Sequence, residues 1–245
     1  MSEPILEVDD ISKRFRGVWA VRDVRFTVPP HSIVGIIGPN GSGKTTLLNV
    51  CSGVYPPTSG RVRVDGQDVT AQPAHRRAHV GVTRTFQEAR VFKTLTCLQN
   101  MRVPLIHSSD VGKMEAREQA ERLLSLVGLI DKIDTPASEL SGGQRKLLEF
   151  ARAMMTKPRL ILMDEPFAGV HPVLKEQMTK SIEAARNQGV TALIVSHELP
   201  VLLGLAERVI CMAEGNVLFE GPPSQVTSDP RVIEAYLGSG NGDHG

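Results

Sequence analysis

The sequence lacks a long hydrophobic run. No stretch of the 245-residue chain approaches the roughly 18 apolar residues needed to cross a bilayer. The first residues, Met1 to Pro4, include an acid and a proline and are not followed by a signal-like apolar segment, so we expect no signal peptide. If the protein serves a membrane process, another chain must therefore supply the membrane-spanning part.

Cysteine is scarce, and neither sign of charge dominates. Cys51, Cys97 and Cys211 are far apart, odd in number and without CxxC spacing, which predicts reduced thiols and argues against a disulfide framework. The 28 Lys and Arg residues are balanced by 27 Asp and Glu residues, so composition gives no bulk attraction to nucleic acid or to an anionic membrane. We therefore expect no nucleic-acid partner.

The N-terminal part of the chain has the pattern of strands. Residues 5–28 alternate apolar and polar positions, and Gly17 predicts the turn between two antiparallel strands. Residues 33–37 form a short, β-branched apolar run that suits a strand buried on both faces. Residues 61–64 alternate again and end at an Asp-Gly pair, which predicts a further strand and a turn.

Between residues 88 and 157 the apolar residues take helical spacing instead. Residues 115–127 and 144–155 place apolar side chains among charges at helical intervals. Strand-like runs then return at residues 160–163, 192–195, 208–212 and 216–220. The alternation predicts an α/β fold with a parallel central sheet, an antiparallel β subdomain and an inserted α-helical subdomain. A polar, glycine-rich tail should follow and be mobile.

The strongest chemical signal is a glycine-rich loop between the strand at 33–37 and a helix. It fits G-x-x-x-x-G-K-[ST], the P-loop pattern, with Gly38, Pro39, Asn40, Gly41, Ser42, Gly43, Lys44 and Thr45, and Thr46 follows. Glycines let several backbone N–H groups converge on phosphate oxygens at the positive end of the helix dipole. Lys44 would add a charge for the outer phosphates, and the Thr45 hydroxyl would be a magnesium ligand.

Two acids directly follow the apolar run at 160–163. Asp164 and Glu165 should therefore lie at the carboxyl edge of the sheet, where α/β proteins bind ligands. Asp164 would hold magnesium through water, and Glu165 would polarise the attacking water as a general base. An acid at a helix start is the ordinary alternative for such a pair. The complete P-loop favours the catalytic interpretation.

A third motif separates this chain from other P-loop proteins. Leu140-Ser141-Gly142-Gly143-Gln144 comes just before a helix rich in charge. A serine and two glycines at a helix start offer a hydroxyl and bare backbone donors, a second anion cradle. A lone Ser-Gly-Gly is usually a loop, but this motif stands in a specific combination with the P-loop and the acid pair.

Together these motifs resemble the nucleotide-binding subunits of ABC transporters, over nearly the whole chain. The resemblance implies that residues 140–144 are the signature motif, which reaches across a dimer to the partner's γ-phosphate. It implies that Gln87 is the Q-loop glutamine, which touches magnesium and links the core to the helical lobe. His197 is similar to the switch histidine at the γ-phosphate, and Phe15 to the aromatic residue that stacks on adenine.

The resemblance also implies an architecture and partners. Residues 1–245 would form one nucleotide-binding domain with a P-loop NTPase core. Residues 1–87 and 158–245 would be the catalytic core with its β subdomain, and residues 88–157 the helical subdomain. ATP and Mg²⁺ would bind between two ATPase subunits, identical or different. Transmembrane permease subunits would dock beside the Q-loop, which places the protein at the cytoplasmic face of the cell membrane.

Several segments resemble the ATPases of branched-chain amino-acid importers, notably residues 84–87, 168–170 and 229–238. This kinship implies an importer with an extracytoplasmic solute-binding protein, although relatives move urea, amides or lipid precursors. A soluble ABC ATPase and a regulatory module without hydrolysis are the rival hypotheses. One departure from the family is His171, which stands where a coupling aspartate is usual. Communication between the two sites through that residue is therefore in doubt.

Overall fold

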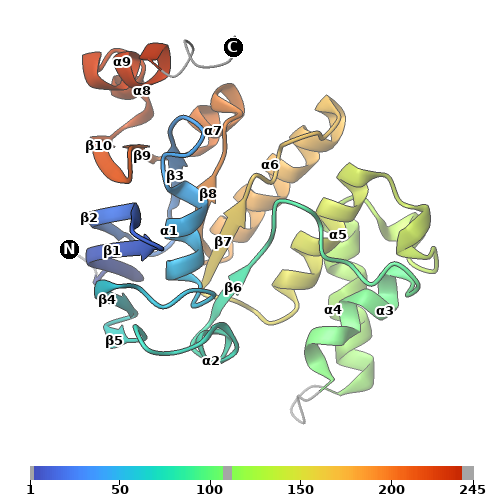
Figure 1. Cartoon of the computed structure of the whole chain (residues 1–245). Coiled ribbons are helices and arrows are strands. Elements are labelled where there is room, and N and C mark those ends of the chain that lie inside the picture. Colours follow the sequence, from blue (N-terminus) through green and yellow to red (C-terminus); the bar gives the residue numbers. More distant parts are fainter. Residues whose placement is uncertain (1–2, 107–111, 239–245) are drawn as a thin grey trace.

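The computed structural model describes residues 3–106 and 112–238, and its strands form two sheets (Figure 1). The larger sheet is parallel except at its β10–β9 edge, as the sequence predicts. In spatial order its six strands are β10 (Asn216–Gly221), β9 (Arg208–Ala213), β3 (Ile33–Ile37), β8 (Thr191–Val195), β7 (Leu160–Asp164) and β6 (Val82–Arg84).

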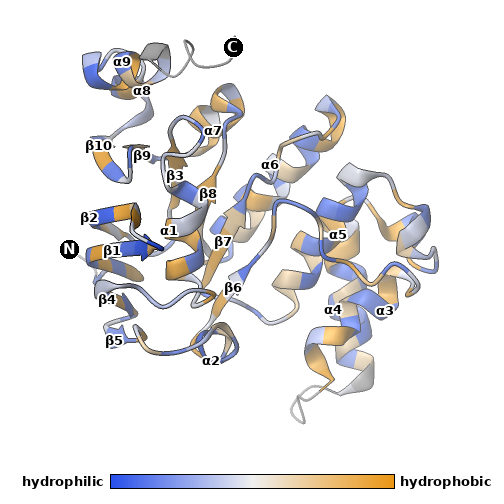
Figure 2. Ribbon diagram, in the orientation of Figure 1, coloured by the Kyte–Doolittle hydropathy of each residue, from blue (hydrophilic) through white to orange (hydrophobic). Residues whose placement is uncertain are grey.

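The strands β3, β7 and β8 are buried at every residue, because both faces of the central sheet are covered. Along β3, Ile33 and Ile37 belong to one hydrophobic cluster, while Val34 and Ile36 belong to the other. Figure 2 shows these strands as a hydrophobic band inside the molecule. The parallel strands end together at one edge, and that edge carries the polar motifs.

The smaller sheet is antiparallel, in the order β2-β1-β4-β5. Its strands are β1 (Leu6–Phe15), β2 (Val18–Val28), β4 (Ser59–Val64) and β5 (Gln67–Asp68). The predicted hairpin is confirmed: Phe15 pairs with Val18, and the turn between them contains Gly17, with φ of 97°. This sheet lies beside α1 (Lys44–Cys51), the helix that follows the P-loop (Figure 1).

Three helices pack against one another on the far side of the core from the antiparallel sheet (Figure 1). They are α3 (Cys97–Arg102), α4 (Lys113–Leu126) and α5 (Gly142–Met154). The two helices predicted at 115–127 and 144–155 are thus confirmed with small shifts of their ends. Three short 3₁₀ helices join them, at Val103–Leu105, Ile130–Lys132 and Ala137–Glu139.

The remaining helices are α2 (Ala74–His79), α6 (Pro172–Asn187), α7 (Leu199–Leu205), α8 (Pro223–Val226) and α9 (Pro230–Gly238). The mobile tail predicted after the last strand is wrong for residues 223–238. Two helices form there because Val226 and Val232 are buried in the core. Residues 239–245 of that tail lie outside the described part of the chain.

Candidate active site

The P-loop connects the end of β3 to the start of α1, and two of its glycines are required by close contacts. Gly38 has φ of 146°, and a Cβ there would lie 2.1 Å from the Met212 carbonyl oxygen. Gly43 has φ of 99°, and a Cβ there would lie 2.3 Å from the Ala20 carbonyl oxygen. Any larger residue would both strain the backbone and force these segments apart. The loop is therefore held between β9 on one side and β2 on the other.

Lys44, the first residue of α1, turns its side chain back into the loop. Its Nζ donates to the carbonyl oxygens of Gly38 and Pro39, both at 2.8 Å, and to the Ser42 hydroxyl at 3.3 Å. Burial lowers the pKa of the Lys44 amine, and the nearby carboxylate of Glu165 opposes that shift. The structure thus places a concentrated positive charge where the sequence predicts phosphate binding.

Asp164 ends β7 directly below the P-loop helix. One carboxylate oxygen lies 3.4 Å from the Thr45 hydroxyl, and the other accepts from Arg84 at 3.1 Å. Burial raises the pKa of Asp164, while the Arg84 charge lowers it. Two of the three predicted magnesium ligands, Thr45 and Asp164, therefore face each other, with oxygen donors of the kind that Mg²⁺ prefers. Within the described residues, no three His, Cys, Asp or Glu side chains group around a possible metal position.

Glu165 and His197 meet at the end of the neighbouring strands β7 and β8. Nδ1 of His197 lies 2.8 Å from Oε2 of Glu165, and the His197 backbone N–H donates to the same oxygen at 3.2 Å. Glu165 has φ of 49°, a left-handed conformation that is uncommon for a residue with a side chain. Such strain is tolerated where the surrounding structure over-determines the position. Here it aims the carboxylate at the pocket.

A pocket of about 550 Å³ brings together half of the predicted site residues. The P-loop forms one wall, and Gln87, Glu165 and His197 form the other. Thr45 and Thr46 of α1 and Ala20 of β2 complete it. The lining residues are Ala20, Asn40, Gly41, Gly43, Lys44, Thr45, Thr46, Gln87, Glu165 and His197.

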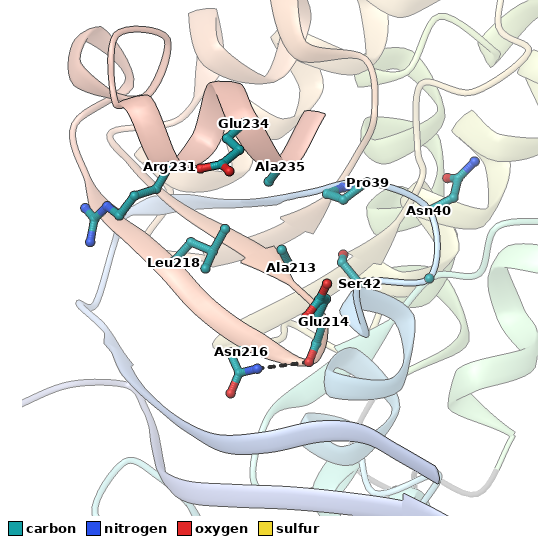
Figure 3. A pocket seen from close by; sticks show the side chains of 11 residues that line it. Pro39, Asn40, Ser42, Ala213, Glu214, Asn216, Leu218, Arg231, Glu234 and Ala235 are labelled. Carbon is teal, nitrogen blue, oxygen red and sulfur yellow. Dashed lines mark hydrogen bonds between the residues drawn. The ribbon is translucent and has the colours of Figure 1, made fainter. Parts of the chain in front are cut away.

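A second hollow of about 640 Å³ lies on the outer side of the P-loop (Figure 3). Residues of the β9–β10 hairpin and of α9 form its other walls. Asn216 donates to the Glu214 carbonyl at 2.9 Å, the dashed line in Figure 3. The Gly215 backbone N–H donates to the Ser42 carbonyl at 3.1 Å. The hairpin therefore supports the P-loop from behind.

Comparison with known proteins shows which protein family shares this fold and these motifs. The model of the family described as ABC transporter matches residues 21–168, more than half of the chain. The chain belongs to the ABC transporter family. A second family model, described as branched-chain amino acid ATP-binding cassette transporter, matches residues 216–241 of this ABC protein.

Individual relatives match the ABC protein along most of its length. It is 37% identical to the high-affinity branched-chain amino acid transport ATP-binding protein BraF of Pseudomonas aeruginosa, over 97% of this chain and 99% of the relative. A crystal structure of the ADP conformation of an ABC transporter cassette shares 34% identity with a TM-score of 0.86, covering 97% and 100% of the two chains. A dimeric cassette bound to ADP and phosphate shares 25% identity and a TM-score of 0.81, covering 89% and 98%. The fold class is confirmed, and the ABC protein is an ATPase.

The signature segment lies away from this pocket. Ser141 caps α5, accepting from the Gln144 backbone N–H at 3.2 Å, and the Gln144 side chain accepts in return from the Ser141 N–H at 2.9 Å. A Cβ on Gly142 would have no neighbour within 4 Å, whereas one on Gly143 would lie 2.8 Å from Leu174. None of the four residues Ser141 to Gln144 lines the pocket of their own chain.

Phe15 also lies outside the pocket lining. Its ring meets Tyr55 edge-on, with 5.4 Å between the ring centres, and the Lys13 ammonium lies 5.0 Å from the Phe15 ring. The side chain is 39% exposed, so its outer face is accessible to another planar group. The structure therefore leaves the predicted adenine contact of Phe15 as a prediction.

Sequence reasoning missed Arg84, Lys146 and Glu149 as neighbours of the site. Arg84 contacts Asp164, and Lys146 donates to the carbonyl oxygens of Glu165 and Ala168 at 2.6 and 2.9 Å. Glu149 is 3% exposed in the middle of α5. For Lys146 and Glu149, the available signal was a repeat of charged residues at three-residue spacing along α5. Among the described residues no helix is long and apolar enough to cross a membrane.

Proposed function

We propose that this protein is the ATP-hydrolysing subunit of an ABC importer for branched-chain amino acids or related small solutes. The observation that carries the proposal is the pocket that joins Lys44, Gln87, Glu165 and His197 at the carboxyl edge of the sheet. The match of the C-terminal segment to the branched-chain cassette family supports the solute class. The named relative from Pseudomonas aeruginosa supports it as well.

ATP would bind with its phosphates in the P-loop, residues 38–45. The backbone N–H groups of the loop and the α1 dipole attract phosphate oxygens. Lys44 would exchange its contacts with the Gly38 and Pro39 carbonyls for contacts with the outer phosphates. Mg²⁺ fits the facing oxygens of Thr45 and Asp164, with Gln87 beside them, and when bound it would neutralise phosphate charge.

Glu165 would act as the general base for the attacking water. Its carboxylate is aimed at the pocket by the strained backbone and is held by two contacts from His197. His197 lies half exposed at the mouth of the pocket, where it can also reach the terminal phosphate of ATP. The pair would thus position water and phosphate together, which is the main protein contribution to phosphoryl transfer.

A second ATPase subunit would complete each site. Gly142 at the start of α5 is exposed, Gly143 beside it is buried, and neither lines the pocket of its own chain. A facing subunit, identical or a sister protein, could therefore receive ATP against Ser141, Gly142, Gly143 and Gln144. The solved dimeric cassette with ADP and phosphate supports this arrangement. Phe15 would contact the adenine from the rim of the site.

The remaining assignments follow from this role. Permease subunits would dock on the helical subdomain, residues 88–157, and the catalytic core would comprise residues 1–87 and 158–245. The protein would lie at the cytoplasmic face of the membrane, with a solute-binding protein on the other side and no nucleic acid. The test is reconstitution with its permease subunits in proteoliposomes. ATP hydrolysis stimulated by a leucine-loaded binding protein supports the proposal, and hydrolysis indifferent to every branched-chain solute overturns the solute class.

A further inference from the structure

One side of α5 carries three charged residues at three-residue spacing, Lys146, Glu149 and Arg152, which we call the α5 clamp. Lys146 donates to the backbone carbonyls of Glu165 and Ala168. Arg152 donates to the backbone carbonyl of Arg90. All three members of the clamp thus contact backbone of the loops that border the nucleotide pocket. Such contacts constrain the path of a loop whatever its side chains are.

Glu149 makes the most specific contact of the three. Its Oε1 accepts from the Arg90 backbone N–H at 2.9 Å, and its Oε2 accepts from the Phe86 backbone N–H at 3.4 Å. The two amides flank Gln87, so one carboxylate closes the loop that carries this glutamine. The Arg90 guanidinium lies 3.9 Å from the Phe86 ring centre, which ties the same two ends together.

Burying a carboxylate at this position costs desolvation free energy unless hydrogen bonds to the carboxylate compensate for it. Glu149 is 3% exposed, and burial raises its pKa, whereas the two backbone amides lower it. A buried charge is retained where hydrogen bonds compensate its desolvation. Both carboxylate oxygens are occupied by Q-loop backbone, so the compensation comes from that loop.

We propose that Glu149 is a positioning residue that makes the Q-loop move with α5, so that engagement of the signature glycines is transmitted to Gln87. The proposal rests on the proposed function for its consequences in catalysis. Gly142 and Gly143 start α5, and Glu149 lies two turns further along the same rigid helix. A helix that is drawn toward the partner's phosphate at its start must therefore carry the Gln87 loop with it.

Lys146 extends the same link to the catalytic carboxylate. It holds the carbonyl oxygens of Glu165 and Ala168, the beginning of the loop that leads to His171. The α5 clamp thus connects the signature of one nucleotide site to Gln87 and Glu165 of the other site. This route does not use the side chain of His171, the residue that stands in place of the usual aspartate.

The direct test is hydrogen exchange of the intact protein. Glu149→Gln keeps the shape of the side chain but turns an NH₂ group toward one of the two amides. We expect exchange to rise at least about tenfold at whichever amide faces the NH₂ group, Phe86 or Arg90, which is the range for losing a hydrogen bond to a charged group. Peptides from residues 147–154 should keep their protection. Equal loss of protection throughout α5, or none at the two amides, overturns the positioning role.

The matched control is Gln119→Leu. Gln119 is also a buried polar residue of the helical lobe, 7% exposed, and donates to the Met155 carbonyl at 3.1 Å. Gln119 contacts the C-terminal end of α5 and, among the described residues, has no hydrogen bond to the Q-loop. This variant should leave exchange at Phe86 and Arg90 unchanged. Increased exchange there in the control as well would show that any damage to the lobe loosens the loop, and would overturn the proposal.

A kinetic cycle then separates positioning from general destabilisation. Glu149→Gln should lower kcat about tenfold, as expected for one lost charge-assisted hydrogen bond, with little change in the KM for ATP. In a Gln87→Ala background the same change should cost less than about twofold, because the two residues act in series. A full further loss in that background overturns the proposal. Absence of hydrolysis in the unmodified protein would instead contradict the proposed function, and the exchange result would stand by itself.

Discussion

Arg84 donates to one carboxylate oxygen of Asp164 at 3.1 Å and leaves the other oxygen facing Thr45 at 3.4 Å. Both side chains of the ion pair are at least 90% buried. The guanidinium is itself held by Asn49 and by Ser52, at the end of α1. The pair therefore fixes the orientation of Asp164 relative to the P-loop helix.

Replacing Arg84 should destabilise the protein strongly. Arg84→Met leaves Asp164 buried without its partner, and breaking such a pair costs about 3–5 kcal/mol in the free energy of unfolding. Thermal or urea unfolding measures this. The double variant Arg84→Met, Asp164→Asn should recover part of the loss, because no uncompensated charge remains. A double variant no more stable than Arg84→Met would mean that the contacts to Asn49 and Ser52 dominate.

The Arg84→Met defect should depend on pH. Burial raises the pKa of Asp164 and Arg84 opposes this, so the variant raises that pKa further. A carboxyl group whose folded-state pKa is raised favours folding below its unfolded pKa, and this contribution is lost as pH rises through the folded pKa. The variant should therefore lose more stability at neutral pH than at mildly acidic pH. An equal loss at both would contradict the assigned cause.

Glu165→Gln should separate binding from hydrolysis. The amide preserves size and hydrogen bonding but cannot accept a proton, so turnover should fall roughly 100- to 10,000-fold. ATP affinity measured by calorimetry should be retained, and size-exclusion chromatography should show an ATP-bound dimer. Turnover within threefold of the unmodified protein would exclude Glu165 as the general base.

Lys44 and His197 should affect different steps. Lys44→Ala removes a charge that acts on the phosphates before and during reaction, so nucleotide affinity itself should fall. His197→Ala should lower kcat and leave affinity mostly intact, because its contact is with Glu165 and the reacting phosphate. Calorimetry and steady-state kinetics measure both. Unchanged affinity in the first variant, or equal losses of affinity and rate in the second, would reverse these assignments.

Mixing two inactive variants should restore ATPase activity if each site is shared between subunits. Lys44→Ala removes the lysine, and Gly142→Asp places a carboxylate against phosphate, a like-charge clash. Gly142 has open space around it, so the aspartate is accommodated in the monomer fold. A mixed dimer contains one doubly damaged site and one site made from intact parts. Activity should therefore return in part, with a supralinear dependence on protein concentration.

The controls for this mixing experiment are each variant alone at the same total concentration. No recovery at any ratio would mean that the site is complete in one chain or that the partner is a different protein. Adding the permease subunits and any sister ATPase separates these cases, because only a missing partner is restored in that way.

The central strands and the pocket residues were predictable because their signals are local. Residues 33–37 and 160–163 are continuous apolar runs because both faces of the sheet are buried, and the P-loop is a contiguous motif at a strand end. Short helices such as α2 and α7 contain too few turns for a clear periodicity. They depend on tertiary packing for their stability.

Residues whose role depends on distant contacts could not be predicted in this way. Arg84 meets Asp164 across 80 positions of sequence, and Glu149 meets Arg90 across 59. The sequence shows only a charged residue in each place, and spacing alone does not reveal its partner. The exposure of Gly142 is a similar case, because the sequence does not show that this residue lies outside the pocket of its own chain.

The first and the last β-hairpins of the described chain meet behind the P-loop, and this limits how the protein can be engineered. The Ala20 carbonyl borders Gly43, the Met212 carbonyl borders Gly38, and Arg22 donates its backbone N–H to the Gly215 carbonyl at 2.8 Å. A minimal fragment cut to the motif-bearing middle of the chain would lose both supports of its phosphate loop. Split halves or circular permutants must therefore keep the first hairpin and the last hairpin together to preserve nucleotide affinity.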